Sequence, residues 1–340
     1  FWLKAEMRAT LGFLLILGLS WLLYSGHLVE LLRPPSIVCH AGRPCDPSWE
    51  TFSYPDIRIT EHLSDAERYR AVLRFKWWLQ TAPQLSQQEW HEMLGVLSRR
   101  FAQRVESGSS PLIVVVGASS LVKEVDFFRS ICSWANGTCR FVLVEPNELV
   151  LPALRQRARH LGVELQQVQV VHAALCPQGV EGAVLHRCSQ RLSKDFPAVE
   201  AQSLEELAAL DRGVLLRSIE TFRTVTRVPL LANISAYLEE EPVRCLTPAA
   251  LLAEAAAAPE ALDFLSVDTE GHDAQLLELF LGLPGLRPAL VQFEWAFFHG
   301  HEPPQLQRYT QLLRSLHSKG YDIRKQHVNM LAIAAPSTQG

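Results

Sequence analysis

Apolar, strand-like runs alternate with helical stretches from residue 111 onward, and this alternation constrains the fold more than any other feature. Residues 112–116, 141–144 and 168–171 are continuous apolar runs, and each ends at a glycine or a polar residue. Further strands are predicted at 264–268 and 289–293, and helices at 149–161, 248–258 and 274–283. Strands that are apolar on both sides are buried on both faces. The sequence therefore predicts an α/β fold with a mostly parallel sheet between two layers of helices.

Three less regular segments complete this part of the chain. Residues 321–324 and 328–333 predict a C-terminal antiparallel hairpin, and 183–186 a fourth strand at an edge of the sheet. Residues 187–246 have little periodicity, apart from one helix predicted to begin near Ser203. We interpret 187–246 as an insertion that covers the pocket and selects the substrate.

The N-terminal region has a different character. Residues 1–32 contain an apolar stretch preceded by Lys4 and Arg8, which predicts a cytoplasmic tip followed by a transmembrane signal anchor. A cleaved signal peptide is the alternative. Residues 33–63, rich in proline and turn residues, are interpreted as a stem, and 64–106 as a pair of helices, 64–80 and 86–105, packed on the body. This organisation predicts a single-pass membrane protein of the Golgi or endoplasmic reticulum with a lumenal body.

Cysteines and glycosylation motifs agree with a lumenal body. Asn136-Gly-Thr and Asn233-Ile-Ser match the N-glycosylation acceptor pattern, which predicts a glycoprotein. The pairs Cys39/Cys45 and Cys132/Cys139 are spaced to close small loops in an oxidising compartment. The alternative, preferred for most of the following four, is that they are small core residues: Cys132, Cys176, Cys188 and Cys245.

Charge and cysteine spacing argue against a nucleic-acid-binding protein and against a structural zinc site. The net charge of −4 and the pI near 6.3 are unlike the basic footprint of a nucleic-acid-binding protein. No Cys-x-x-Cys pattern is present, so no structural zinc site, and no metal site of any kind, is predicted.

Four ionisable residues follow the strand at 264–268 within a few positions: Asp268, Glu270, His272 and Asp273. They stand at the carboxyl end of a predicted parallel strand, where open α/β sheets bind their ligands. Ionisable groups beside an apolar strand are costly unless something binds them. The alternative is a solvated helix start, since acidic residues favour the first turn.

Two residues at neighbouring strand ends indicate a nucleoside site. Gly117 ends the first strand, where a tight turn lets the backbone approach a ligand. Glu145 ends the second, where a carboxylate can accept hydrogen bonds from both ribose hydroxyls of an adenosine. The three-glycine dinucleotide fingerprint is absent.

The order of these motifs resembles the FkbM-type methyltransferases over roughly residues 110–335. The segments that carry the resemblance are Val116-Gly-Ala, Val144-Glu-Pro-Asn, Val171-His-Ala-Ala, Leu265-Ser-Val-Asp-Thr-Glu-Gly-His-Asp and Ala289-Leu-Val-Gln-Phe-Glu. The resemblance implies a Rossmann-like class I fold that binds S-adenosylmethionine and methylates a hydroxyl oxygen, often on a sugar or another small molecule.

The resemblance also implies a role for each matching residue. The cofactor-binding residues would be Gly117, Ala118, Ser119, Glu145, Asn147 and His172. The methyl-transfer pocket would be lined by His272, Asp268, Glu270 and Asp273, with His272 the best candidate base because of its pKa. The first loop departs from the family pattern, since Val115 and Leu121 stand where the family has an acid and a second glycine.

The leading hypothesis is therefore a membrane-anchored O-methyltransferase that acts on a glycan or small-molecule acceptor, with no nucleic-acid partner. A second hypothesis is a lumenal glycosyltransferase in which Asp268 and Glu270 hold a metal ion. A third is a non-catalytic binding module that keeps the methyltransferase fold, suggested by the altered first loop.

Overall fold

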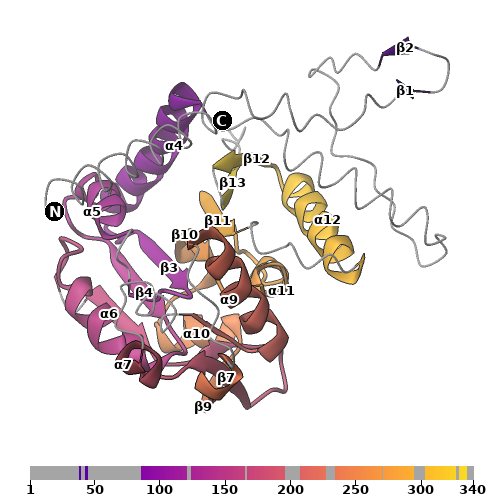
Figure 1. Cartoon of the computed structure of the whole chain (residues 1–340). Helices are drawn as coiled ribbons and strands as arrows, with labels where there is room; N and C mark the ends of the chain where they lie inside the picture. Colours follow the sequence, from indigo (N-terminus) through magenta and orange to yellow (C-terminus); the bar gives the residue numbers. More distant parts are fainter. Residues whose placement is uncertain are drawn as a thin grey trace, which may run out of the picture. The chain divides into compact units, whose positions relative to one another are not determined.

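The computed structural model describes residues 38–39, 43–44, 86–120, 124–164, 167–195, 207–226, 234–269, 271–294, 303–326 and 329–334 (Figure 1). The chain divides into two compact units, Phe1–Tyr54 and Pro55–Gly340. In the first unit the described residues form one antiparallel pair, β1 (Val38–Cys39) and β2 (Arg43–Pro44). The second unit holds all the other described elements.

A seven-stranded sheet is the centre of the second unit, with the strand order β12-β13-β11-β10-β3-β4-β5. Its strands are β3 (Leu112–Val116), β4 (Arg140–Val144), β5 (Val168–Val171), β10 (Leu262–Val267), β11 (Leu290–Glu294), β12 (Tyr321–Gln326) and β13 (Asn329–Ala334). The five strands from β11 to β5 are parallel, and β13 is antiparallel to both of its neighbours. The predicted sheet and its C-terminal hairpin are confirmed.

Helices lie on both sides of this sheet (Figure 1). Their bounds are α4 (Gln87–Glu106), α5 (Val125–Ser133), α6 (Leu151–Ala158), α7 (Arg191–Asp195), α9 (Arg212–Thr226), α10 (Pro248–Glu254), α11 (Asp273–Leu281) and α12 (Pro303–Ser318). Side chains of α4, α5 and α6 form one core cluster with β3 and β4. On the other side α11 packs against β10, with α10 and α12 beside it. The fold is a three-layer α/β sandwich.

Local sequence signals account for several helix ends. Ser86 and Glu89 form a capping box at the start of α4, each side chain bonding the other residue's backbone N–H. The Thr247 hydroxyl accepts from Ala250 N at 3.1 Å and caps α10, whose first residue is Pro248. The predicted helix at 149–161 is a 3-10 turn, Glu148–Val150, followed by α6. The predicted helix at 64–80 lies outside the described residues.

A second, four-stranded sheet begins before the region predicted to be an insertion and extends into it. Its order is β6-β9-β7-β8, with β6 (Ala174–Leu175), β7 (Gly182–Cys188), β8 (Ala208–Ala209) and β9 (Leu238–Leu246). The prediction that 183–186 is an edge strand of the main sheet is wrong, because β7 pairs with β8 and β9 instead. The start of the helix predicted near Ser203 lies outside the described residues, and α9 begins at Arg212, after β8. Residues 201–206 are outside the described ranges.

Two disulfides join cysteines of the second unit, Cys132 to Cys139 and Cys176 to Cys245. The first is one of the predicted pairs. The alternative of small core residues is wrong for Cys132, Cys176 and Cys245. Ala174 of β6 pairs with Cys245 of β9, which brings Cys176 within reach of Cys245. Cys188 is buried in the core beneath α9, as expected. Cys39 pairs with Arg43 in the first unit, and Cys45 lies outside the described residues.

Within the described ranges no helix combines the length and the apolar character that a membrane span requires. The predicted anchor at residues 1–32 lies outside those ranges.

Candidate active site

Gly117 forms a tight turn at the carboxyl end of β3. Its N–H and that of Ala118 both donate to Val144 O, at 2.9 and 3.0 Å. The residue has φ +74°, and a Cβ there would lie 1.6 Å from the backbone oxygen of Asp268. Only glycine satisfies both conditions. The turn therefore brings the ends of β4 and β10 against the end of β3.

Glu145 ties the first loop to the second. Its buried carboxylate accepts from Ser119 N through Oε2 and from Asn147 N through Oε1, both at 2.7 Å. Ser119 has φ +44°, and this bond helps to hold that left-handed conformation. A carboxylate can accept several hydrogen bonds through its two oxygens, so Glu145 is of the chemical type that binds ribose hydroxyls.

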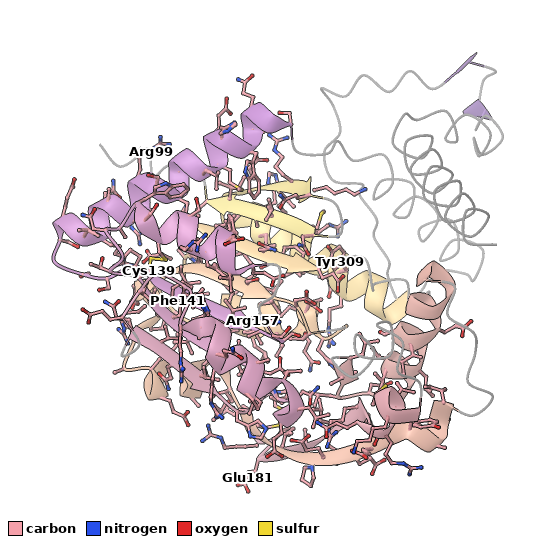
Figure 2. All side chains as sticks on the ribbon, turned by 60° about the vertical axis from the view of Figure 1, so that its left-hand side comes forward. Arg99, Cys139, Phe141, Arg157, Glu181 and Tyr309 are labelled. Carbon is pink, nitrogen blue, oxygen red and sulfur yellow. A yellow bond between two sulfur atoms is a disulfide. The ribbon has the colours of Figure 1, made fainter. Side chains whose placement is uncertain are left out.

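Two more side chains shape the same edge. Asn147 is fully buried, and its Oδ1 accepts from Leu149 N at 3.1 Å, so it caps the turn that follows. Arg157 of α6, labelled in Figure 2, donates to Ser120 O at 2.8 Å and braces the first loop from outside.

His172 follows β5, and its ring contacts the Glu145-Pro146 turn. Its Nε2 lies 3.0 Å from Pro146 O and 3.5 Å from the Glu241 carboxylate of β9. Glu241 also accepts from Arg187 Nε of β7 at 2.8 Å. The second sheet thus reaches the predicted adenine side of the site through a chain of charged groups.

The acidic loop after β10 contains two carboxylates in different surroundings. Asp268 is exposed beside Gly117, whereas Asp273 is buried. Asp273 Oδ1 accepts from Thr269 N at 3.3 Å, and its Oδ2 from Thr269 Oγ1 and Gly271 N at 3.3 and 3.2 Å. Burial, reinforced by the charge of Asp268, raises the pKa of Asp273 to about 7. Asp273 holds the loop, and Asp268 faces solvent. Glu270 lies outside the described residues.

His272 belongs to a neighbouring cluster under α9 and α12. Its pKa is lowered by burial, with Gln275 and Asp211 opposing that shift and the charge of Arg308 adding to it. The ring is therefore neutral at pH 7. Its Nε2 is buried and has no hydrogen-bond partner among the described residues. A neutral imidazole with an unsatisfied buried nitrogen is chemically suited to accept a proton or to bind a ligand.

Helix α9 covers the acidic loop at this point. A Cβ on Gly271, which has φ +106°, would lie 3.3 Å from Val214 Cγ1. Asp211 Oδ1 accepts from Val214 N at 2.8 Å, which fixes the start of α9. Helix α9, which belongs to residues 187–246, therefore lies against the acidic loop.

The structure brings the predicted residues together in three groups rather than one. Gly117 contacts Asp268, Glu145 binds Ser119 and Asn147, and His272 lies among residues of α9, α11 and α12. Sequence reasoning missed Asp211, Arg187, Glu241 and Arg308. Asp211, three residues before Val214, carries a helix N-cap signal. The other three carry no local signal, because their partners are distant in sequence.

Val115 occupies the position where the resemblance expects an acid, and its side chain belongs to the core cluster beneath α4 and α5. Asp263, at the other end of β10 from Asp268, accepts from Arg100 Nε and Arg104 Nε, both at 2.9 Å, and from Leu112 N. Asp263 therefore joins α4 to the sheet and takes no part in the site. No set of three or more His, Cys, Asp or Glu side chains is arranged to hold a metal ion in the described ranges.

A sheet ordered β12-β13-β11-β10-β3-β4-β5, with one antiparallel strand and a glycine turn and an acid at the ends of β3 and β4, defines a Rossmann-like class I methyltransferase fold. The model of the methyltransferase FkbM domain family matches residues 116–323, more than half of the chain. The chain belongs to this family and is a methyltransferase.

Several solved structures, two of them methyltransferases, are similar to the chain at low identity. The precorrin-6y C5,15-methyltransferase of Geobacter metallireducens is 11% identical, with a TM-score of 0.31, over 75% of this chain and 92% of that one. The O-methyltransferase of Bacillus cereus, in complex with SAH, is 11% identical with a TM-score of 0.30, over 82% and 94%. Cofactor-bound Rv0187 from MTB is 11% identical with a TM-score of 0.33, over 81% and 92%. No curated protein matches the chain.

Proposed function

We propose that the chain transfers a methyl group from S-adenosylmethionine to a hydroxyl oxygen of a glycan or small molecule. One observation carries the proposal. Gly117, Glu145 and Asp268 lie at the carboxyl ends of β3, β4 and β10, which are neighbours in the sheet. Parallel α/β sheets bind their ligands at this edge, and family membership selects the methyl donor.

The residues at this edge fit the adenosine part of the cofactor. Glu145 is the carboxylate that would accept from the ribose hydroxyls, and Asn147 and His172, which contact the same turn, would flank the adenine. Gly117 and Ala118 pass under the methionine part. Val115 leaves no acid for the cofactor's amino group, and we assign that role to Asp268, an exposed acid whose backbone carbonyl lies against Gly117.

The cofactor, when bound, supplies an electrophilic methyl group on a sulfonium. The protein must align the acceptor hydroxyl with it and remove one proton. His272 is the proposed base, because its neutral ring has a buried Nε2 with no hydrogen-bond partner among the described residues. Asp273 keeps the loop between Asp268 and His272 in place, and Glu270 is retained as a pocket residue on sequence grounds.

The acceptor side is formed by the insertion. Val214 of α9 lies against Gly271, and Asp211 contributes its charge at His272. We assign the choice of acceptor to residues 187–246, since α9 in this segment covers the loop that carries the proposed base.

We also propose a lumenal location for the body in the endoplasmic reticulum or Golgi, with residues 1–32 as the membrane anchor. The two disulfides support it, because such bonds persist in oxidising compartments.

One observation favours a second candidate, a binding module without turnover. Val115 is packed in the core and cannot serve as the missing acid. This candidate predicts cofactor binding without methyl transfer, whereas the leading proposal predicts both.

Radiolabelled methyl transfer tests the proposal with the full chain and a panel of glycans and small hydroxylated compounds. We expect labelled product, and we expect His272→Asn to lower turnover about 100-fold or more with little change in cofactor affinity. Because the pKa of His272 is lowered, the acid limb of wild-type turnover should lie below the ordinary histidine value and disappear in the variant. Binding of S-adenosylhomocysteine without transfer to any acceptor in the panel would favour the binding module.

A further inference from the structure

A disulfide-closed loop between α5 and β4 exposes one asparagine. The loop runs from Cys132 to Cys139, whose sulfurs are bonded beside the Cys139 label in Figure 2. Both cysteines are buried, whereas Asn136 at the tip of the turn is exposed. Gly137 N donates to Cys132 O at 3.1 Å, and Asn136 N to Ser133 O at 3.2 Å. The disulfide and these bonds present the Asn136 side chain to solvent.

Asn136 begins the acceptor pattern Asn136-Gly137-Thr138. It has φ +50°, a left-handed conformation that asparagine tolerates better than most residues. Conformation alone therefore accounts for an asparagine here, but it does not require threonine two positions later. The Thr138 hydroxyl donates to Ala135 O at 2.7 Å, a bond that serine could also make. The loop thus combines an exposed amide, the complete pattern and a disulfide typical of the compartment in which the pattern is used.

We propose that Asn136 carries an N-linked glycan. In the glycosylation reaction, the Asn136 side-chain nitrogen bonds to the anomeric carbon of an oligosaccharide carried on a lipid diphosphate. The bond from that carbon to the phosphate oxygen breaks, the amide loses one proton, and the lipid diphosphate leaves. The reaction belongs to the host's transferase, and this chain contributes only the acceptor.

The position of the loop keeps the glycan away from the methyl-transfer site. Arg140, directly after Cys139, begins β4, and Arg140 N donates to Pro111 O just before β3. Asn136 therefore lies at the amino edge of the sheet, and Glu145 at the carboxyl edge. The five residues of β4 separate these edges by about 16 Å at 3.3 Å per residue. A glycan on Asn136 leaves the proposed cofactor site open, so occupancy and cofactor binding can be measured independently.

Two substitutions at Thr138 provide a matched pair. Thr138→Ser keeps the acceptor pattern and the hydroxyl, whereas Thr138→Ala removes both and leaves Asn136 unchanged. The full chain would be expressed in a eukaryotic secretory host with Asn233→Gln added to remove the second pattern. Occupancy is read by releasing glycans with an amidase in heavy-oxygen water, which converts a glycosylated Asn136 to labelled aspartate in peptide mass spectrometry.

We expect labelled Asp at 136 in the parent chain and in Thr138→Ser, and none in Thr138→Ala. S-adenosylhomocysteine affinity should be the same in all three. An unlabelled Asn136 in the parent chain would overturn the proposal, and so would equal labelling in Thr138→Ala. Failure of cofactor binding with Asn136 occupied would count against the proposed methyl transfer and leave the glycan assignment standing.

Discussion

Gly117 lies against the backbone carbonyl of Asp268, so that the turn after β3 and the acidic loop after β10 form one surface. The contact requires both the absence of a side chain and a left-handed φ at residue 117. It explains how a glycine and an acid that are far apart in the chain become neighbours. The proposal that Asp268 binds the cofactor's amino group, in place of the acid that Val115 replaces, depends on this contact.

Gly117→Ala should separate the two loops. The added Cβ would meet Asp268 O and also impose a left-handed conformation on alanine, so we expect a loss of about 2–4 kcal/mol in the free energy of unfolding. Gly108→Ala is the control, because Gly108 has φ +75° and nothing within 4 Å of a Cβ. It should lose only about 1–2 kcal/mol. Urea denaturation measures both, and equal losses would show that the Gly117–Asp268 contact is unimportant.

Asp263→Asn should weaken the attachment of α4 to the sheet. It removes the charge from a fully buried carboxylate that binds Arg100, Arg104 and Leu112 N, and breaking such a pair costs about 3–5 kcal/mol. Asp126→Asn is the control, because the Asp126–Arg129 pair is exposed and should change stability by less than about 1 kcal/mol. A loss at Asp263 no greater than the control would contradict this role.

The stability of the fold should depend on the protonation of Asp273. Its carboxyl has an ordinary pKa of 3.8 in the unfolded chain and about 7 in the fold, because of burial and the Asp268 charge. Between these values the folded protein holds a proton that the unfolded chain lacks. The contribution to stability is therefore complete below the lower value and is lost as the pH rises through the higher one.

We expect the free energy of unfolding to fall by up to about 1.4 kcal/mol per pH unit between pH 5 and 7 from this residue. Asp273→Asn should flatten that part of the profile relative to wild type. In Asp268→Asn the pKa of Asp273 in the folded protein should be lower than in wild type, since one cause of the raised pKa is gone. The decline in stability should therefore end at a lower pH in this variant. Profiles of wild type and Asp273→Asn with the same slope would refute the assignment.

Glu241→Gln should weaken cofactor binding from outside the site. Glu241 links Arg187 to His172, and losing this charged partner is expected to lower S-adenosylhomocysteine affinity about 5-fold, equivalent to about 1 kcal/mol. Glu240→Gln is the matched control, because Glu240 is exposed and approaches His186 instead. Calorimetry would measure both under conditions where each variant is folded. Equal affinities in the two variants would remove His172 from the adenine side.

The Cys176–Cys245 disulfide should stabilise the second sheet. The double variant Cys176→Ala/Cys245→Ala opens a link between residues 69 apart in sequence and is expected to lose about 2–5 kcal/mol. Dithiothreitol should destabilise wild type more than this variant, which keeps only the Cys132–Cys139 bond to reduce among the described pairs. Identical effects of the reductant on the two proteins would contradict the prediction.

The main sheet was predictable because its strands are short apolar runs that need no knowledge of their partners. Strand β9 was not, because Glu239, Glu240 and Glu241 follow one another and conceal any alternation. These residues lie opposite the part of β7 that contains His186 and Arg187, so the strand depends on cross-strand ion pairs that only the fold reveals.

The placement of Gly117, Glu145 and Asp268 was predictable, because each directly follows an apolar strand and so stands at the carboxyl edge of the sheet. The surroundings of His272 were less predictable, because they come from α9 and α12. The pairing of Cys176 was also less predictable, because its partner lies in a strand with no clear sequence signal.

Calorimetric titration of the full chain with S-adenosylhomocysteine tests the central claim most directly. We expect saturable binding that Glu145→Gln weakens at least about 10-fold, because the charged acceptor of the ribose hydroxyls is lost. Melting temperatures of both proteins would show that the variant remains folded despite the altered bonds to Ser119 and Asn147. Absence of heat and of any thermal shift at millimolar ligand, with wild type folded, would contradict the account.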